Sequence, residues 1–183
     1  MKKPFLLIFA TLLLFTGGYA LDLNDFSYSM DAVNEVELEK YLGTWYEYAR
    51  LDVSFERGLF NTQANYTLLK PDCKGRTRVR VINSGVKNGN PRKAKGRAIM
   101  PNPAEPGRLL VSFFGPFYGD YNIIALDTEN YQWAMVAGGS TKYLWILTRE
   151  KELDTKILDM LKFKAQQYGF DTDALIYPQT SNE

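Results

Sequence analysis

The sequence predicts an all-β protein, an eight-stranded antiparallel up-and-down β-barrel with one C-terminal α-helix packed outside. From residue 63 onward, seven segments rich in β-branched and aromatic residues follow one another, separated by turn-forming residues. With a strand that begins at Gly43 they make eight, the number that closes a small barrel, and their short links require antiparallel neighbours. An amphipathic segment over residues 154–168 supplies the helix.

The bounds of these elements follow from periodicity and from turn residues. Residues 36–43 predict a helical turn that leads into the first strand at Gly43. Turn-rich links such as SGVKNGNP (84–91) and GPFYG (115–119) separate the later strands. The helix has one apolar stripe, an Asp/Thr cap at its start and Gly169 at its end, and ALIYP (174–178) predicts a short final strand. The seven later strands are expected at 63–70, 76–83, 92–100, 108–114, 120–127, 131–137 and 143–150.

Composition narrows the function. The chain has 183 residues and a net charge of +1, which indicates one globular domain and argues against a nucleic-acid partner, since phosphate contacts need a cationic excess. Aromatic residues make up 14% of the chain, which favours β structure or an aromatic-lined cavity. There is no histidine, so the sequence lacks the commonest general base and metal ligand. We expect no catalytic residue, no metal and no cofactor.

Residues 1–20 have the pattern of a secretory signal peptide, and residues 21–183 form the single barrel domain. Lys2 and Lys3 precede an apolar run from Phe5 to Phe15, and small residues flank a cut after Ala20. An uncleaved anchor is the alternative. No cysteine follows the run, so we expect no lipobox cysteine and no acyl anchor, and a protein in the periplasm, outside the cell or associated with the outer membrane. Cys73 is alone and lies in a turn-like stretch, as a free thiol or as one half of an intermolecular disulfide.

Several motifs resemble the lipocalin family, in particular its bacterial outer-membrane branch and apolipoprotein D-like members. They are GTWYEYARLDVSFERG (43–58), YNIIALD (121–127) followed by Tyr131, and YLWILTRE (143–150) before a C-terminal helix. The resemblance covers about residues 34–178. It implies that Trp45 plugs the closed base of the barrel and that Arg149 packs across its ring as a cation–π pair.

Alternation along the strands then sorts the side chains. In the first strand it places Glu47 and Ala49 inside, above Trp45, and Tyr48 and Arg50 outside. For residues 108–114 the inward assignment comes from the resemblance to retinol carriers. Several inward residues are small, which predicts a hollow interior; a filled aromatic core is the alternative. The predicted ligand-binding pocket comprises Glu47, Ala49, Phe60, Ala64, Tyr66, Val79, Ala98, Val111, Phe113, Tyr121, Ile123, Tyr143, Trp145 and Leu147.

A blind apolar barrel favours one long apolar molecule that enters tail first, at about 0.8 kcal/mol for each buried CH₂. We therefore expect the protein to bind and to transport or store a small hydrophobic ligand, a fatty acid or a lysophospholipid, in cell-envelope lipid maintenance or a stress response. A lipid-modifying or isomerase-type barrel enzyme is the alternative. Glu47 either pairs with a buried polar group or faces the ligand's head. We expect a monomer or homodimer.

The outside of the predicted barrel is basic on one side. The expected outward residues there are Arg76, Arg78, Arg80, Lys93, Lys95 and Arg97. These residues form either a solvated face that protects a sheet edge or a surface for transient contact with anionic membrane. Leu59, Phe60, Phe117 and Tyr118 lie on expected loops, which suits the mouth of a pocket.

Overall fold

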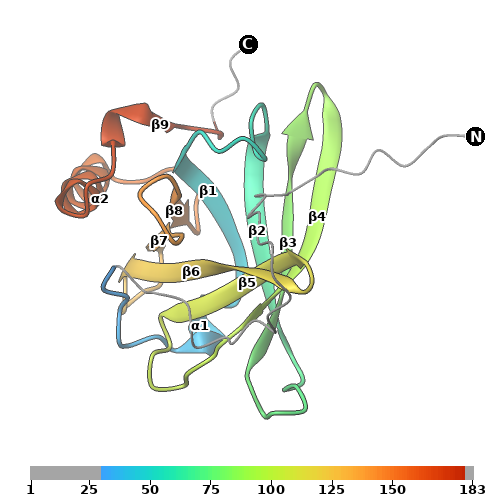
Figure 1. Ribbon diagram of the computed structural model, residues 1–183. Coiled ribbons are helices and arrows are strands. Elements are labelled where there is room, and N and C mark those ends of the chain that lie inside the picture. Colours follow the sequence, from blue (N-terminus) through green and yellow to red (C-terminus); the bar gives the residue numbers. More distant parts are fainter. Residues whose placement is uncertain (1–29, 180–183) are drawn as a thin grey trace, which may run out of the picture.

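A computed structural model of the chain describes residues 30–179 and confirms the predicted fold (Figure 1). Eight antiparallel strands close into a barrel, because β2 pairs with β3 on one side and with β1 on the other. A ninth strand pairs with β1 outside the barrel. The elements are α1 (Leu38–Tyr41), β1 (Gly43–Leu51), β2 (Phe60–Leu69), β3 (Arg78–Lys87), β4 (Asn90–Ile99), β5 (Arg108–Phe114), β6 (Phe117–Leu126), β7 (Trp133–Ala137), β8 (Leu144–Thr148), α2 (Thr155–Gln167), a 3₁₀ turn (Thr172–Ala174) and β9 (Leu175–Ile176).

Two of the predicted links are wrong, because the strands continue through them. β3 and β4 pair as far as Lys87 and Asn90, with only Asn88 and Gly89 between them. Both have positive φ, 51° and 69°, which is the requirement of a two-residue type I′ hairpin. The Asn-Gly pair was therefore the turn, and the residues around it belong to a long hairpin. In the same way β6 begins at Phe117, inside the predicted link 115–119.

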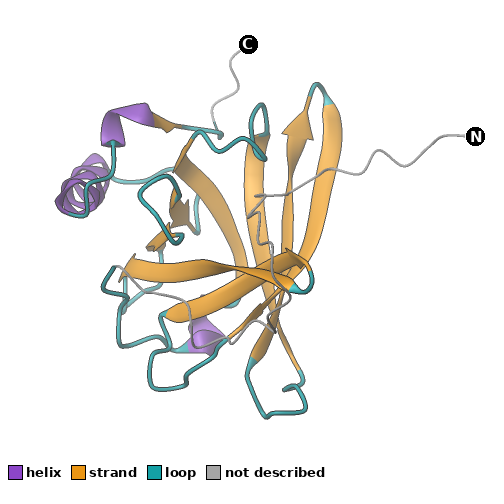
Figure 2. Ribbon diagram, viewed as in Figure 1, coloured by secondary structure: helices purple, strands orange, loops and turns teal. Residues whose placement is uncertain are grey.

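The strands run between two ends that differ in structure (Figure 2). α1 and the start of β1 lie at one end, which we call the closed end. The β1–β2 loop, the β3–β4 and β5–β6 turns and the β7–β8 loop lie at the other, which we call the mouth. Up-and-down topology dictates this alternation, since each strand reverses the direction of the one before it.

A bulge in β1 makes the prediction for its upper half wrong. Glu47 pairs with Leu147 and Ala49 pairs with Ile146, so Tyr48 is an extra residue in β1. An extra residue reverses the alternation beyond it. Ala49 consequently packs outside, in the cluster that contains α2, whereas Arg50 turns inward and is fully buried. Period-2 reasoning from Trp45 holds as far as Tyr48 and fails from Ala49 onward.

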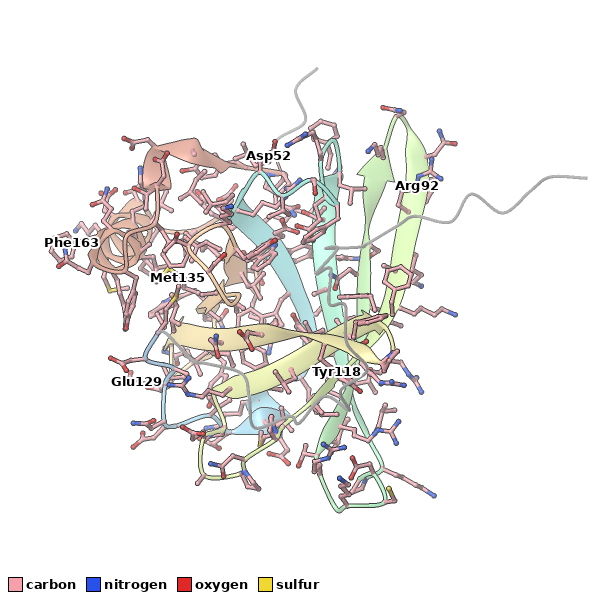
Figure 3. The ribbon with its side chains drawn as sticks, viewed as in Figure 1. Asp52, Arg92, Tyr118, Glu129, Met135 and Phe163 are labelled. Carbon is pink, nitrogen blue, oxygen red and sulfur yellow. The ribbon has the colours of Figure 1, made fainter. Side chains whose placement is uncertain are left out.

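The helix covers the outside of β1, β6, β7 and β8. The Asp154 side chain accepts a hydrogen bond from the Lys156 amide at 2.7 Å and caps α2 at its N-terminus. Leu161 and Ala165 are fully buried against Leu144 and Ile146. Phe163 lies on the side of α2 away from the strands, and Met135 lies beneath the helix (Figure 3). A second apolar cluster lies inside the barrel, so the wall is packed on both sides in this region.

Candidate ligand-binding site

The closed end is sealed by one arginine and one tryptophan. The Arg149 guanidinium lies 3.9 Å from the centroid of the Trp45 ring, and Trp45 is fully buried. Arg149 also donates to three backbone carbonyls within 3.0 Å, those of Thr44, Lys40 and Leu42. These bonds join α1 to β1 and to the end of β8. The pair therefore stabilises the base of the barrel and leaves Trp45 no contact with solvent.

The β6–β7 loop completes this seal. Asp127 accepts hydrogen bonds from the amides of Asn130 and Gln132, which holds the loop in a tight turn. Tyr131 follows with a positive φ of 56°; its hydroxyl accepts from the Glu37 amide at 2.8 Å. Asp127 and Tyr131, four positions apart in the sequence, are thereby brought to one corner of the closed end.

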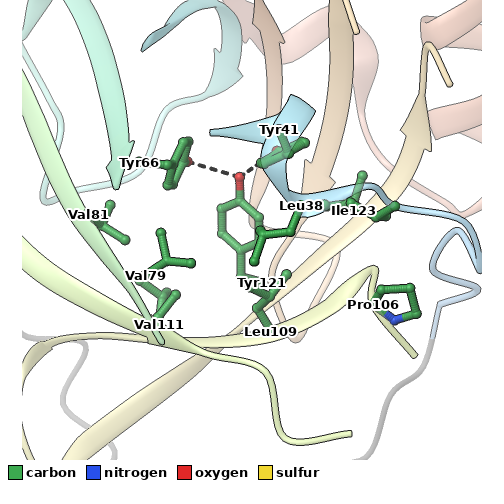
Figure 4. Close-up of a pocket in the computed structure, with 12 residues that line it drawn as sticks. Leu38, Tyr41, Tyr66, Val79, Val81, Pro106, Leu109, Val111, Tyr121 and Ile123 are labelled. Carbon is green, nitrogen blue, oxygen red and sulfur yellow. Dashed lines mark hydrogen bonds between the residues drawn. The ribbon is translucent and has the colours of Figure 1, made fainter. Parts of the chain in front are cut away.

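Three tyrosines stand directly above the seal (Figure 4). The Tyr121 hydroxyl lies 2.7 Å from that of Tyr41 and 2.9 Å from that of Tyr66. Burial raises the pKa of all three hydroxyls above the ordinary value, so each keeps its proton at neutral pH. Three protons serve two hydrogen bonds, so one O–H remains to donate elsewhere. We call these residues the tyrosine triad.

The lower barrel is nearly full, so the predicted hollow does not reach the closed end. A cavity of about 20 Å³ lies among the tyrosine triad and six predicted pocket residues line it, which is room for about one water. Tyr41 enters from α1 and occupies space that the strand pattern alone left open. The lining residues that were predicted are Tyr66, Val79, Ala98, Val111, Tyr121 and Ile123.

Solvent reaches the upper barrel. Most inward residues near the closed end are buried, with Tyr121 as an exception, whereas several inward residues nearer the mouth are only half-buried although they point into the barrel. The half-buried inward residues include Asn83, Ala94, Val111, Phe113, Tyr121 and Trp145. These side chains lie on the inner wall, so water reaches them through the mouth and beside the upper part of β4, which pairs with β5 over Arg97–Ile99 alone.

Stacked aromatic rings line one side of this accessible half. Tyr143 stacks on Trp145 with 6.3 Å between ring centroids, and Phe55 from the β1–β2 loop stacks on Tyr143 at 6.4 Å. On the other side Phe113 packs against Gly96, where any Cβ would meet the ring at 2.8 Å. Gly96 therefore leaves room for the Phe113 ring, whereas the small inward residues of the sequence had predicted empty space.

A buried charged cluster lies between these rings and the barrel wall. The Arg50 Nε atom is 3.3 Å from Glu47 Oε1 and 3.4 Å from Glu56 Oε2, and Trp145 donates to Glu56 at 3.0 Å. All three charged residues are at least nine-tenths buried. Two carboxylates share one guanidinium, and Glu47 Oε1 and Arg50 Nη1 accept or donate no further hydrogen bond among the described residues. We call Glu47, Arg50 and Glu56 the acid–arginine cluster.

Burial sets the protonation of this cluster. It raises the pKa of Glu47 to about 8, with repulsion from Glu56 adding to the effect and Arg50 opposing it. Burial also raises the pKa of Glu56, against the hydrogen bond from Trp145 and the charge of Arg50. At neutral pH Glu47 therefore holds its proton.

The sequence missed two members of this cluster. Arg50 was placed outside because the bulge at Tyr48 could not be seen, and Glu56 lies in a loop to which no periodicity applies. Of the remaining predicted residues, Ala64 and Leu147 are buried in the inner cluster. Phe60 lies at the start of β2, beside the mouth, and is not part of that cluster.

Neither a metal site nor a membrane-spanning helix is found between residues 30 and 179. No group of three or more cysteine or acidic side chains there is placed to hold a metal ion. No helix in that range is long and apolar enough to cross a membrane.

Comparison with known proteins places this barrel among well-defined relatives. A family model described as the lipocalin-like domain matches residues 36–180. The chain is 44% identical over 153 residues to outer membrane lipoprotein Blc of Vibrio cholerae, with 82% of this chain and 86% of that protein covered. It is 42% identical to the protein of the same name in Escherichia coli K12 over 80% of this chain and 81% of that one. It is 32% identical to mouse apolipoprotein D, over 80% of this chain and 78% of that protein.

The same fold occurs in a solved structure of low sequence identity. Insecticyanin from the tobacco hornworm aligns with a TM-score of 0.65 and 23% identity, over 85% of this chain and 86% of that one.

These relatives contradict the localisation predicted from the N-terminus. The bacterial relatives are named outer membrane lipoproteins, and this contradicts the localisation expected for a protein without a lipid anchor. The one cysteine of the printed sequence is Cys73. Residues 1–20, from which that expectation came, lie outside the described residues.

The length of the matches, as well as their sequence identity, establishes the family. The family model spans nearly all of the described residues, and several relatives exceed 40% identity over about four-fifths of the chain. Members of this family bind small hydrophobic ligands and are generally binding and transport proteins. The chain belongs to the lipocalin family.

Proposed function

We propose that the protein binds and carries or stores a single-chain lipid, a fatty acid or a lysophospholipid, for maintenance of the cell envelope or for a stress response. The acyl tail lies in the upper barrel and the polar head lies toward the mouth. The observation that carries this proposal is the partial exposure of inward aromatic and apolar side chains, while the lower barrel is sealed. A blind, apolar, solvent-accessible interior favours a long apolar ligand over a compact polar one.

The tyrosine triad sets how far a tail can enter. Only about 20 Å³ is open beside it, far below the roughly 300 Å³ at which ligand pockets begin. The tail therefore ends above Tyr121, against Val111 and Phe113. The free O–H of the triad faces a space of one water, which supports a floor that is wet at one point and apolar elsewhere.

The acid–arginine cluster supports binding rather than catalysis. Glu47 and Glu56 both contact Arg50, so neither carboxylate is free to serve as an unpaired acid or base. With Glu47 protonated the cluster carries one negative charge fewer, and it tolerates an apolar tail beside it at lower cost than an isolated charge would. We propose accordingly that the protein is not an enzyme.

Narrowing the upper barrel tests this function. Val111→Trp adds bulk to the inner wall of β5, and Ile82→Trp adds the same bulk to the outer face of β3. Both proteins are titrated with a fluorescent fatty acid, which is then displaced by unlabelled fatty acid or by lysophospholipid. We expect Val111→Trp to bind at least tenfold more weakly, about 1.4 kcal/mol, and Ile82→Trp to bind like the wild type.

Two results would count against the proposal. One is equal binding by all three proteins, which would place the lipid outside the barrel. The other is that neither lipid class displaces the probe, which would indicate another hydrophobic ligand. Circular dichroism and thermal unfolding of both variants show whether a loss of binding reflects a loss of fold.

A further inference from the structure

The positive charge of this nearly neutral protein is concentrated on one part of the barrel. Residues 73–104, which include β3 and β4, contain nine basic and no acidic residues. The rest of the chain has 13 basic against 21 acidic residues. Such separation produces a strong local potential despite the net charge of +1.

The outward side chains of β3 and β4 present this charge to solvent. Val79, Val81 and Ala98 are buried inside the barrel, so their sequence neighbours point out. We call the outward residues Arg78, Arg80, Lys93, Lys95 and Arg97 the basic face. Among the described residues no acidic side chain forms a salt bridge with any of the five.

Repulsion between the like charges of the basic face lowers the stability of the fold. Arg80 lies directly opposite Arg97 in the β3–β4 ladder, and like charges in that position repel. Protection of a sheet edge accounts for Lys93 and Lys95 only, because β4 pairs with β5 over Arg97–Ile99 alone. β3 is paired on both sides, so edge protection does not explain the two arginines on it.

An exposed aromatic tip adjoins the basic face at the mouth. Phe117 in the β5–β6 turn region is 68% exposed and Phe114 is 38% exposed. Arg97 donates to the Tyr118 hydroxyl at 2.8 Å and lies over the Tyr118 ring, so the tip and the face are in direct contact. Figure 3 shows Tyr118 and Arg92 on the same side of the molecule.

A surface groove of about 330 Å³ continues the basic face toward the β3–β4 turn. Lys93, Ser84 and Gln63 line it and supply hydrogen-bond donors. Donors beside positive charge suit a phosphate group. Basic residues, a groove with hydrogen-bond donors and an exposed aromatic tip together are the chemistry that binds the surface of an anionic bilayer.

We propose that the basic face and the Phe117 tip dock the protein on an anionic lipid bilayer, with the mouth of the barrel beside the membrane. This docking does not depend on which molecule the barrel binds. The positive side chains lie against anionic headgroups, and Phe117 inserts between them at the level where aromatic rings are favoured.

Sedimentation with vesicles tests the proposal on the full-length protein. Vesicles of phosphatidylcholine alone are compared with vesicles that also contain phosphatidylglycerol, at low and high salt. The variants are Arg80→Glu/Lys95→Glu and Phe117→Ser. Their matched controls on α2 are Lys156→Glu/Lys164→Glu and Phe163→Ser, the last at a phenylalanine that is 65% exposed.

We expect wild type to bind the anionic vesicles and to lose that binding at high salt. The basic-face double variant should bind them at least tenfold more weakly and Phe117→Ser several-fold more weakly, whereas both controls bind like wild type. Equal binding to the two vesicle types, or an equal loss in the α2 controls, overturns the proposal. Arg80→Glu should fold at least as stably as wild type, because it replaces a like-charge pair with an opposite-charge pair.

Discussion

Replacing Tyr121 by phenylalanine removes one oxygen atom and leaves two buried hydroxyls without their partner. Tyr121 is the middle of the tyrosine triad, and the hydroxyls of Tyr41 and Tyr66 both contact it. Replacing Tyr66 instead removes an end of the triad, and the bond between Tyr41 and Tyr121 survives. Both substitutions delete one hydroxyl oxygen at the triad. They differ mainly in the number of buried hydroxyls that each leaves without a hydrogen-bond partner.

The structure sets the expected magnitudes. A buried hydroxyl that loses its partner costs about 1–3 kcal/mol, so Tyr121→Phe should cost about 2–6 kcal/mol. One water can enter the adjoining cavity of about 20 Å³ and pair in part with the stranded hydroxyls, which favours the low end, about 2 kcal/mol. Tyr66→Phe should cost about 1 kcal/mol, the net value of one hydrogen bond.

Urea unfolding followed by tryptophan fluorescence measures both values, with the slope of free energy against urea checked for constancy. The variant in which Tyr41, Tyr66 and Tyr121 are all phenylalanine is the control. It buries no hydroxyl at the triad, so it should be less destabilised than the sum of its parts. Equal losses for Tyr121→Phe and Tyr66→Phe, together with additive losses in the triple variant, would refute the reasoning.

Three other substitutions test separate parts of the barrel. Trp45→Ala should lower the free energy of unfolding by about 3–5 kcal/mol, and wild-type stability with lost lipid binding would show that the seal is wrongly assigned. Glu47→Gln should flatten the pH dependence of the free energy of unfolding. The pKa of Glu47 is raised from 4.5 to about 8, so the stabilisation that its proton provides is complete below pH 4.5 and is lost as the pH rises toward 8. The loss is up to about 1.4 kcal/mol per pH unit. Urea titrations across that range should show the wild-type pH dependence for the exposed control Glu129→Gln. Trp145→Ala should weaken fatty-acid binding tenfold to a hundredfold, about 1–3 kcal/mol, and unchanged displacement of a fluorescent fatty acid would contradict the tail position.

The fold was predictable because local patterns and global topology agree in this chain. Eight strand patterns with short links permit few arrangements other than an antiparallel barrel, and the Asp154 and Gly169 signals located the helix within one residue at each end. The long β3–β4 hairpin was missed although Asn88-Gly89 is a strong hairpin signal, because the polar residues around it lack alternation.

The site was less predictable, since it depends on features that alternation does not encode. A single bulge at Tyr48 exchanges the sides of Ala49 and Arg50, and no residue type there signals it. Glu56 reaches the interior from a loop, and Tyr41 reaches it from a one-turn helix. Each is positioned by tertiary contacts between segments far apart in the sequence.

Calorimetric titration with saturated fatty acids of increasing length tests the central claim most directly. If the tail lies in the upper barrel, each added CH₂ should strengthen binding by about 0.8 kcal/mol, roughly fourfold, until the tail reaches the tyrosine triad. Beyond that length the affinity should stop rising, and the heat-capacity change should be negative throughout. Affinity that does not depend on chain length would contradict a ligand held by its tail inside the barrel.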